Sequence, residues 1–317
     1  MKKFMKKSAV FIAILLLSGG LLYFVFPQSI LFVSMKIDRI KASAYEREIT
    51  INHEKWTYLE AGSEDPQSPV VVLIHGMGGN KDNWMKMARL MTSYRLIIPD
   101  LPGFGNHPLQ DSVTYTPEKT SELLEDFFTS LDLKNINLVG VSMGGMVAGY
   151  YASIHPERIS TLTLMDTAGV GTNNLSEFMT LVFSTGKNPL LYETVNDFYQ
   201  AMDFILNRKP DIPDTIIQYM VKKKIERLPV EKKFIADYIG SDYYLLDSRL
   251  SFITSPTLIL WGEKDRIIDV SAVENMKDKI KTNEIVILKD ACHAPMICAS
   301  KETAEALDHF FKAQHKK

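Results

Sequence analysis

Ser142 lies in a short segment, Gly140-Val141-Ser142-Met143-Gly144, whose residue types and spacing suit nucleophilic chemistry. A run typical of a buried strand, INLVGV, leads into it, and a helical pattern, GGMVAGYYASIH, follows. Side chains two residues before and after the serine would collide in so tight a turn, and glycine at both places removes the collision. The serine is then exposed at the carboxyl end of a strand, where α/β sheets bind ligands. We therefore predict that Ser142 is the nucleophile of an acyl-transfer reaction.

A glycine-rich segment, HGMGG, begins at His75 and directly follows another run typical of a buried strand. Acyl transfer creates an oxyanion, which backbone N–H groups must already face before the reaction. Glycines allow that close approach, and the expected donors are the N–H groups of Met77 and Met143. His75 precedes this oxyanion hole, so we expect it to be a structural hydrogen-bonding residue rather than a catalyst.

A base and an acid should follow the nucleophile in the order acid, then histidine. Asp265 follows the strand pattern TLILW, and His293 follows the strand pattern EIVIL, so both would lie at carboxyl ends of strands. In the implied mechanism His293 takes the proton of the serine and passes it to the leaving alcohol, while Asp265 orients the imidazole. Asp166, after another strand, is the alternative acid, and Asp269 is a second one that should enter the next helix. No metal-ligand cluster or phosphate-binding loop is evident in the sequence, so no cofactor is expected.

The elements that must position these residues alternate along the chain. Two short strands are predicted within 45–61, further strands at 70–74, 94–99, 136–141, 162–165, 257–261 and 285–288, and helices at 117–131, 142–155 and 301–312. Continuous apolar strands that alternate with helices indicate a mostly parallel sheet covered on both faces. The expected fold is therefore α/β, with a mostly parallel eight-stranded sheet flanked by helices.

Residues 172–250 break this alternation, because they contain helical patterns and no buried strand. Prolines at positions 189, 210, 213 and 229 are expected to separate these helical segments. We interpret 172–250 as a helical cap inserted over the active site, with the core formed by 45–171 and 251–317. Apolar cap residues such as Tyr199 and Phe204 are expected to shape the substrate pocket.

Charge and cysteine content exclude some functions. The formal net charge is -2, with 36 Lys and Arg against 38 Asp and Glu, so there is no excess of cations to neutralise nucleic-acid phosphates. The chain has two cysteines, Cys292 and Cys298, which are too few for a disulfide framework. We expect them to be small, unpaired apolar residues, with a disulfide as the alternative in an oxidising compartment.

The N-terminus has the pattern of a membrane anchor. Residues 1–8 are basic, and residues 9–26 are uncharged and strongly apolar, enough to span about 27 Å as a helix. The lysines predict a cytoplasmic N-terminus with the rest of the chain on the other side. The alternative is a signal peptide cleaved near residue 20, which would release a secreted protein.

Six motifs together resemble membrane-anchored monoacylglycerol lipases and a group of bacterial lipases of the α/β-hydrolase superfamily. They are HGMGGNKDNW, IPDLPGFG, GVSMGGMVAGYYA, LMDTAG, WGEKDRI and CHAPM, and the resemblance runs over 58–311, including the segment NPLLYETVNDFYQAMDFI of the expected cap. It implies the α/β-hydrolase fold with a cap, and a carboxylic-ester hydrolase that acts on lipid. It also implies a triad of Ser142, Asp265 and His293 with an oxyanion-hole position at Met77. The alternatives are a carbon–carbon bond hydrolase with the same triad and a non-catalytic binding protein on this fold.

Overall fold

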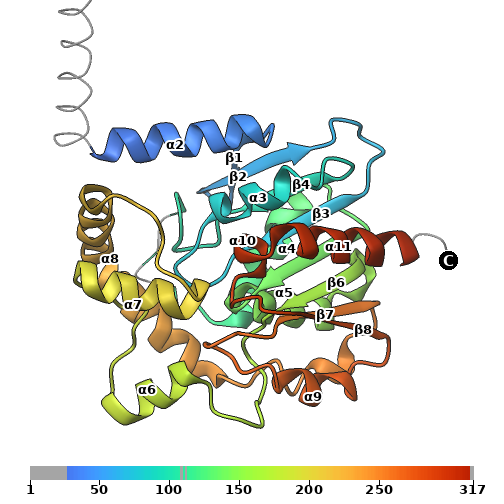
Figure 1. Ribbon diagram of the computed structural model, residues 1–317. Coiled ribbons are helices and arrows are strands. Elements are labelled where there is room, and N and C mark those ends of the chain that lie inside the picture. Colours follow the sequence, from blue (N-terminus) through green and yellow to red (C-terminus); the bar gives the residue numbers. More distant parts are fainter. Residues whose placement is uncertain (1–26, 108–109, 111–112, 315–317) are drawn as a thin grey trace, which may run out of the picture.

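A single eight-stranded sheet organises the computed structural model, which describes residues 27–107, 110 and 113–314 (Figure 1). The order across the sheet is β1 (Tyr45–Ile51), β2 (Glu54–Gly62), β4 (Arg95–Pro99), β3 (Val70–Ile74), β5 (Ile136–Val141), β6 (Ile159–Met165), β7 (Thr257–Gly262) and β8 (Asn283–Leu288). β2 pairs antiparallel with β1 and β4, and every pair from β4 to β8 is parallel. The predicted fold class, a mostly parallel eight-stranded α/β sheet, is confirmed.

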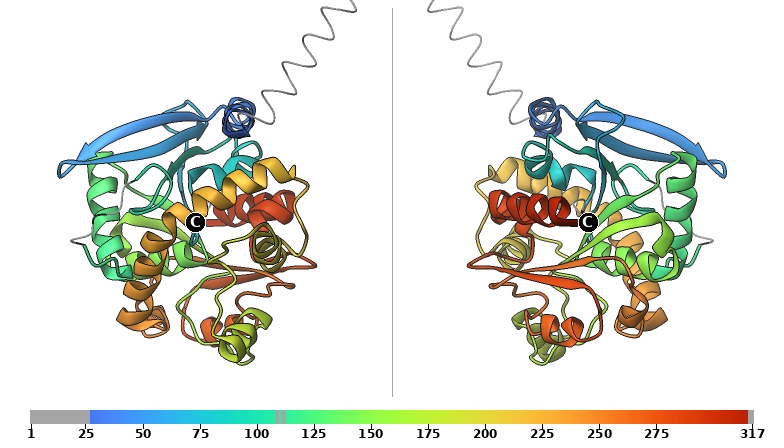
Figure 2. Two further views of the ribbon diagram at one scale, coloured as in Figure 1. Left: turned by 90° about the vertical axis from the view of Figure 1, so that its left-hand side faces the viewer. Right: turned by 90° about the vertical axis from the view of Figure 1, so that its right-hand side faces the viewer.

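Helices cover both faces of the sheet, which explains why the central strands β3 and β5 are buried along nearly their whole length (Figures 1 and 2). In β3, Val72 and Ile74 pack on one face with residues of α4 (Pro117–Ser130) and α5 (Met143–Ile154). The alternate residues Val71 and Leu73 pack on the other face with α3 (Met85–Ala88) and α11 (Ser300–Gln314). Successive side chains of a strand point to opposite faces, so both sets must be apolar.

The helix boundaries follow local signals. α4 begins at Pro117, and the side chain of Thr116 caps it by accepting a hydrogen bond from the N–H of Lys119 at 3.2 Å. The predicted helices at 142–155 and 301–312 correspond to α5 and α11. The remaining short elements are η1 (Lys81–Trp84), η2 (Pro156–Arg158), α9 (Ala272–Lys277) and α10 (Pro295–Cys298).

Between β6 and β7 the chain forms α6 (Glu177–Thr185), α7 (Val195–Leu206), α8 (Asp214–Asp242) and η3 (Leu250–Phe252). The boundaries of the expected cap, 172–250, stay a prediction. The prediction that a helical segment ends at Pro229 is wrong, because this proline lies inside α8. A proline within a helix removes one hydrogen bond and bends the helix without always ending it, and Figures 1 and 2 show α8 changing direction along its length.

The chain enters the fold through α2 (Pro27–Lys41), which lies at the outer edge of the molecule and packs against α8 (Figure 1). The expected basic segment, 1–8, and the expected membrane-spanning run, 9–26, lie outside the described residues. Among residues 27–107, 110 and 113–314, no helix is long and apolar enough to cross a bilayer.

Candidate active site

The predicted site residues meet at one edge of the sheet. His75 follows β3, Ser142 follows β5, Asp166 follows β6, Asp265 follows β7 and His293 follows β8. These strands are parallel neighbours, so their carboxyl ends lie side by side. Residues spread over 219 positions of sequence, from 75 to 293, therefore converge because of the topology of the sheet.

Ser142 occupies a strained turn between β5 and α5. Its backbone angles are φ 54° and ψ -122°, which non-glycine residues rarely adopt and which cluster at functional sites. A Cβ on Gly140 would lie 2.2 Å from the carbonyl oxygen of Gly144. A Cβ on Gly144 would lie 2.4 Å from the carbonyl oxygen of His75. The second clash is with the end of β3 rather than with the other glycine, so the elbow needs Gly144 for a tertiary reason that its own sequence does not show.

Hydrogen bonds hold this strained residue from both sides. The N–H of Ser142 donates to the carbonyl of Met165 at 3.0 Å. The carbonyl of Ser142 accepts from the N–H groups of Gly145 at 2.9 Å, Met146 at 3.1 Å and Ala168 at 3.0 Å. The turn is thus fixed to α5 and to the end of β6, and the serine backbone is held in place before any substrate arrives.

His293 is paired with Asp265. Its Nδ1 lies 2.8 Å from Oδ2 of the aspartate, and both side chains are buried. The other carboxylate oxygen, Oδ1, accepts from the N–H groups of Ile267 at 2.8 Å and Ile268 at 3.0 Å. The carboxylate is therefore held in position, and its bond to Nδ1 leaves Nε2 for the reaction. Asp269 instead accepts a hydrogen bond from the N–H of Ser271 at 3.0 Å.

Asp166 is a second buried carboxyl group beside this pair. Its Oδ1 accepts from the N–H of Gly262 at 2.9 Å, whereas its fully buried Oδ2 meets no hydrogen-bond donor. Burial, and then the charge of Asp265, raise the pKa of Asp166 well above its usual value. A protonated Oδ2 would act as a donor instead of an unpaired acceptor. His293 bonds to Asp265 and not to Asp166, so the geometry favours the first of the two carboxylates as its partner.

Asp166, Asp265 and His293 also offer three potential metal ligands, since their nearest ligand atoms lie within 4.8 Å of one another. Hydrogen bonding accounts for this cluster without a cation. Nδ1 of His293 and a carboxylate oxygen of Asp265 already bond to each other at 2.8 Å. The raised pKa of Asp166, caused first by burial, favours a proton where a metal would need a charged oxygen.

The loop after β3 has the features expected of an oxyanion hole. Met143 is the first residue of α5, and the first N–H groups of a helix have no partner within it. Met77 lies beside Ser142 in the lining of two cavities, and Gly78 adopts φ 70°. His75 is fully buried, and its Nδ1–H donates to the carbonyl of Gly76 at 2.9 Å. Burial lowers the pKa of His75, so it is a neutral structural residue, as predicted.

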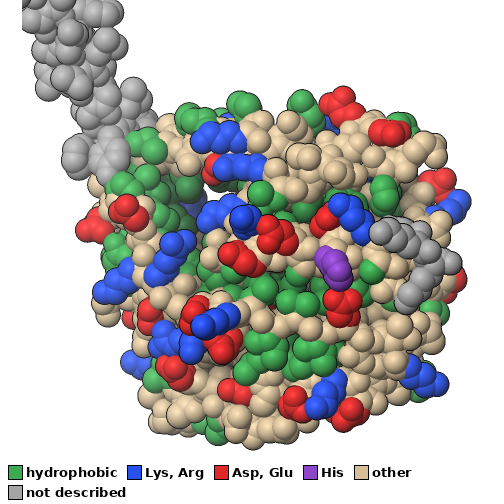
Figure 3. Space-filling view, turned by 45° about the vertical axis from the view of Figure 1, so that its right-hand side comes forward, with side chains coloured by type: hydrophobic (Ala, Val, Ile, Leu, Met, Phe, Trp, Pro, Cys, Tyr) green, Lys and Arg blue, Asp and Glu red, His purple; other side chains and the backbone are tan. Residues whose placement is uncertain are grey.

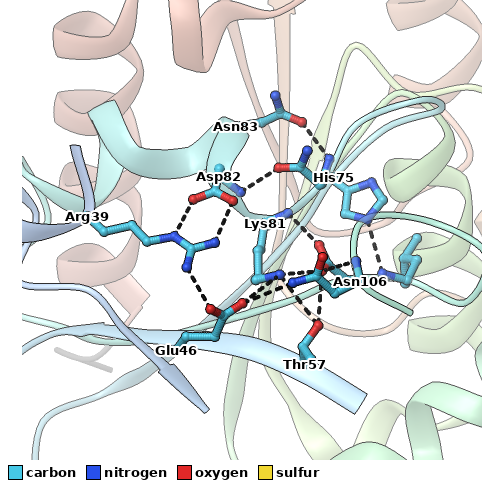
Figure 4. Close-up of polar contacts among 11 residues, drawn as sticks. Arg39, Glu46, Thr57, His75, Lys81, Asp82, Asn83 and Asn106 are labelled. Carbon is cyan, nitrogen blue, oxygen red and sulfur yellow. Dashed lines mark hydrogen bonds and ion pairs between the residues drawn. The ribbon is translucent and has the colours of Figure 1, made fainter. Parts of the chain in front are cut away.

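A buried ion pair that the sequence did not indicate supports this loop from below (Figure 4). Nζ of Lys81 lies 2.5 Å from Oδ2 of Asp100, and both side chains are almost fully buried. The same carboxylate accepts from the N–H of Lys81 at 2.9 Å, the N–H of Asn106 at 2.9 Å and the hydroxyl of Thr57 at 3.1 Å. Burial alone would raise the pKa of Asp100, but the charge of Lys81 and these donors hold it below its usual value.

A second charged contact joins α2 to the start of η1 (Figure 4). The guanidinium of Arg39 donates from Nε to Oδ1 of Asp82 at 2.6 Å and from an NH₂ group to Oδ2 at 2.8 Å, and it also reaches Glu46 at 2.8 Å. The N–H of Asp82 donates in turn to Oδ1 of Asn80 at 2.8 Å. This fork-shaped pairing links the first described helix to the segment that follows the predicted oxyanion loop.

Two cavities open next to Ser142. One, of about 200 Å³, is lined by Ser142 and His293 together with Leu190, Met202 and Ile297 among others. The other, of about 370 Å³, also reaches Ser142. Its lining is mostly apolar and includes Met77, Met143, Met146, Phe178, Met179, Val182, Tyr243 and Ile268.

The expected roles of Phe204 and Tyr199 in shaping the substrate pocket are wrong, because neither side chain lines either cavity beside the serine. Phe204 is buried and stacks edge-on against Phe178. Tyr199 hydrogen-bonds through its hydroxyl to Asp214 at 3.1 Å. Their helical spacing indicated an apolar cap face, but only packing decides which members of such a face reach the substrate.

Cys292 and Cys298 form a disulfide, so the expectation of two unpaired cysteines is wrong. The bond joins the residue before His293 to the last residue of α10, with the two Cα atoms 6.3 Å apart. The N–H of Cys292 also donates to the sulfur of Cys298 at 3.0 Å. Sequence spacing alone could not distinguish two neighbouring thiols from a closed loop that carries the histidine.

Known proteins share this architecture. The family profile described as the alpha/beta hydrolase fold matches residues 69–298. The chain belongs to this family. "Lipase 3" of Moraxella sp. is 30% identical over 275 residues, which is 85% of this chain and 85% of that protein. A monoacylglycerol lipase of Homo sapiens is 24% identical over 276 residues, 84% of this chain and 82% of that one.

Solved structures agree with this assignment. A crystal structure described as a membrane phospholipase A, a bacterial virulence factor, is 31% identical, with a TM-score of 0.87 and complete coverage of both chains. A putative lipase from Acinetobacter baumannii is 28% identical, with a TM-score of 0.81 over 90% of this chain and 96% of that one. A meta-cleavage product hydrolase from Pseudomonas fluorescens, at 19% identity over 84% of this chain and 97% of that one with a TM-score of 0.71, shows the fold alone.

Proposed function

We propose that this serine ester hydrolase cleaves single-chain lipid esters, above all monoacylglycerols, with Ser142 as nucleophile, His293 as base and Asp265 as its orienting acid. The relatives named as lipases support the ester-hydrolase class, and the named monoacylglycerol lipase supports the narrower substrate. The observation that carries the proposal is the apolar cavity of about 370 Å³ that reaches the serine.

The shape of the site supports a particular placement of the substrate. The leaving alcohol must lie near His293, because that residue protonates it. His293 lines the smaller cavity, of about 200 Å³, and does not line the larger one. Glycerol therefore fits the smaller cavity, and the acyl chain fits the larger, more apolar one.

In the proposed mechanism Ser142 attacks the ester carbonyl while His293 accepts the proton from its hydroxyl. The N–H groups of Met77 and Met143 stabilise the oxyanion of the tetrahedral intermediate. His293 then protonates the leaving glycerol, and Asp265 stabilises the charged imidazole throughout. Water enters, loses a proton to the same histidine and hydrolyses the acyl-enzyme, which releases a fatty acid.

We place the enzyme at a membrane, with residues 9–26 as a single-pass anchor and the hydrolase domain on the non-cytoplasmic side. The structural relative described as a membrane phospholipase A supports membrane association. The disulfide between Cys292 and Cys298 suits an oxidising compartment. Fractionation of cells and protease protection of spheroplasts test this placement, and N-terminal sequencing separates an anchor from a cleaved signal peptide.

The substrate assignment is tested by a chain-length profile. Val182 lines the larger cavity from α6, so Val182→Phe should fill part of it and lower kcat/KM for long-chain monoacylglycerols about tenfold or more. A short ester such as p-nitrophenyl acetate should be cleaved at nearly the unchanged rate. Ser184→Phe is the matched control, because it introduces the same side chain at an exposed position of the same helix.

An equal loss on all chain lengths would contradict the acyl-chain role of this cavity. Two further outcomes bear on the substrate and on the class of reaction. Faster cleavage of phospholipids than of monoacylglycerols would make phospholipids the preferred substrate and leave the ester-hydrolase class unchanged. Cleavage of vinylogous diketones, with no activity on esters, would overturn the proposal in favour of a carbon–carbon bond hydrolase.

A further inference from the structure

α2 carries four exposed large hydrophobic side chains, of which Val33, Ile37 and Ile40 lie along one face. Phe32 is 58% exposed, Val33 53%, Ile37 45% and Ile40 76%. Positions 33, 37 and 40 follow the spacing that places side chains on one side of a helix. A contiguous row of this kind on a helix at the molecular edge indicates contact with something outside the described chain, because isolated surface hydrophobic residues lack such spacing.

The opposite face of α2 is fixed to the hydrolase domain. Arg39 is only 7% exposed and forms two bonds to Asp82 and one to Glu46 (Figure 4). Asp38 pairs with Arg89, the residue directly after α3. These contacts determine which face of α2 points outward, and Figures 1 and 2 show the helix at the outer edge of the molecule.

The charges on the outer face favour a lipid surface. Lys36 and Lys41 are exposed on α2, and the Lys36 ammonium lies 5.4 Å from the centroid of the Phe32 ring. Figure 3 shows Lys and Arg side chains next to hydrophobic ones along the upper edge of the molecule, at the height of α2. Apolar residues flanked by lysines are typical of helices that lie in the interface of an anionic bilayer.

The sequence before α2 points to the same occupant. The uncharged apolar run of residues 9–26 ends directly before Pro27, the first residue of the helix. A second copy of the chain fits this face less well. A two-fold dimer through α2 would bring the same lysines of both copies into one interface, where like charges repel.

We propose that the outer face of α2 lies in the headgroup region of an anionic lipid bilayer and sets the orientation of the enzyme on it. The hydrophobic side chains enter the boundary between headgroups and acyl chains, and the lysines contact lipid phosphates. Arg39 then connects this membrane-bound helix to η1 and to the predicted oxyanion loop before it. The active site is held at a constant angle to the surface that supplies its substrate.

The test uses the full chain with a fluorescent label at single positions. Both native cysteines are in the disulfide and the sequence has no others, so an introduced cysteine is the only free thiol. Val33→Cys and Ile40→Cys are each labelled with the environment-sensitive dye NBD. Ile287→Cys in β8 is the matched control, since Ile287 is 50% exposed and the strand β8 lies away from α2 (Figure 1). The proteins are reconstituted with vesicles of phosphatidylethanolamine and phosphatidylglycerol.

The expected result is a blue shift of NBD emission at positions 33 and 40, with quenching by lipids that carry a doxyl group near the headgroup. Position 287 should show neither effect. If the NBD emission at positions 33 and 40 keeps the wavelength that it has in buffer, the proposal is overturned, whether or not the protein binds the vesicles. A concentration-dependent shift without lipid quenching would assign the face to a second copy of the chain.

A kinetic measurement separates this proposal from the proposed function. Ile40→Glu places a charge on the outer face of α2, a helix that contributes no lining residue to either cavity beside Ser142. It should lower the rate on monoacylglycerol in vesicles about tenfold and leave the rate on a soluble short ester unchanged. Equal rates on vesicles for this variant and the native chain would contradict the role of α2. Absence of ester cleavage by the native chain would contradict the proposed function instead.

Discussion

Replacing Asp166 by asparagine should make the protein more stable at neutral pH, although it removes a buried ionisable side chain. Burial and the nearby carboxylate of Asp265 raise the pKa of Asp166 well above its usual value. An amide resembles the protonated acid. The amide oxygen can accept the hydrogen bond from the N–H of Gly262 that Oδ1 now accepts at 2.9 Å. The NH₂ group takes the place of Oδ2, an acceptor atom that meets no donor in the native chain.

The magnitude follows from proton linkage. In the unfolded chain this aspartate should titrate near pH 3.9, whereas the folded chain keeps its proton to higher pH. Stability due to this proton is fully present below about pH 3.9 and is lost as the pH rises from there through the folded pKa. Over that window the loss approaches about 1.36 kcal/mol per pH unit, the value for one proton. Asparagine does not titrate, so Asp166→Asn lacks this loss.

Urea unfolding at several pH values measures the effect. The free energy of unfolding of Asp166→Asn minus that of the native chain should increase with pH between the unfolded and the folded pKa of Asp166, with a slope that approaches about 1.36 kcal/mol per pH unit. Asp290→Asn, at an exposed loop position, is the control and should show no such slope. A difference that is flat with pH, or that decreases as pH rises, would show that the buried carboxyl is ionised in the folded chain and would refute the reasoning.

The other predictions concern the proposed triad and its loop. A fluorophosphonate probe should label the native chain but not Ser142→Ala, and equal labelling would contradict the choice of nucleophile. Asp265→Asn should lower kcat about 10⁴-fold with the fold intact, because the asparagine favours the wrong tautomer of His293. A smaller loss than for Asp166→Asn would reverse the assignment of the acid. Cys298→Ala opens a loop of six-residue separation and should cost about 2 kcal/mol of unfolding free energy, while an unchanged melting curve would show that the bond is absent in solution.

The turn at Ser142 could be predicted from sequence because most of its signals are local. A buried strand, a glycine two residues before and another two residues after Ser142, and a following helix all lie within twenty residues of one another. The structure gives this serine φ 54°, which such a turn demands. The fold class could be predicted for a related reason, since strands covered on both faces are almost continuously apolar, as β3 is and as β5 is apart from Asn137.

The contacts between distant segments could not be predicted in this way. Arg39 and Asp82 are separated by 43 positions, and each belongs to a segment whose polar residues look solvent-exposed in the sequence. Lys81 has the same difficulty, because lysine is rarely buried and nothing near it in sequence shows that Asp100 will pair with it. Likewise, Phe204 and Tyr199 belong to an apolar pattern, but packing turns them away from the cavities.

The apolar strand pattern predicts the sheet, and local motifs predict the turn at Ser142 and the set of residues that could take part in catalysis. The sequence left Asp166 as an alternative to Asp265, because each follows a strand whose carboxyl end lies at the same side of the sheet. Only the tertiary structure shows which of them pairs with the histidine, since Nδ1 of His293 bonds to Asp265 at 2.8 Å while Asp166 bonds to Gly262. It also decided that the two cysteines pair. The physical reason is that periodicity and turn chemistry act over a few residues, whereas hydrogen-bond partners depend on distances that only the packed sheet and loops define.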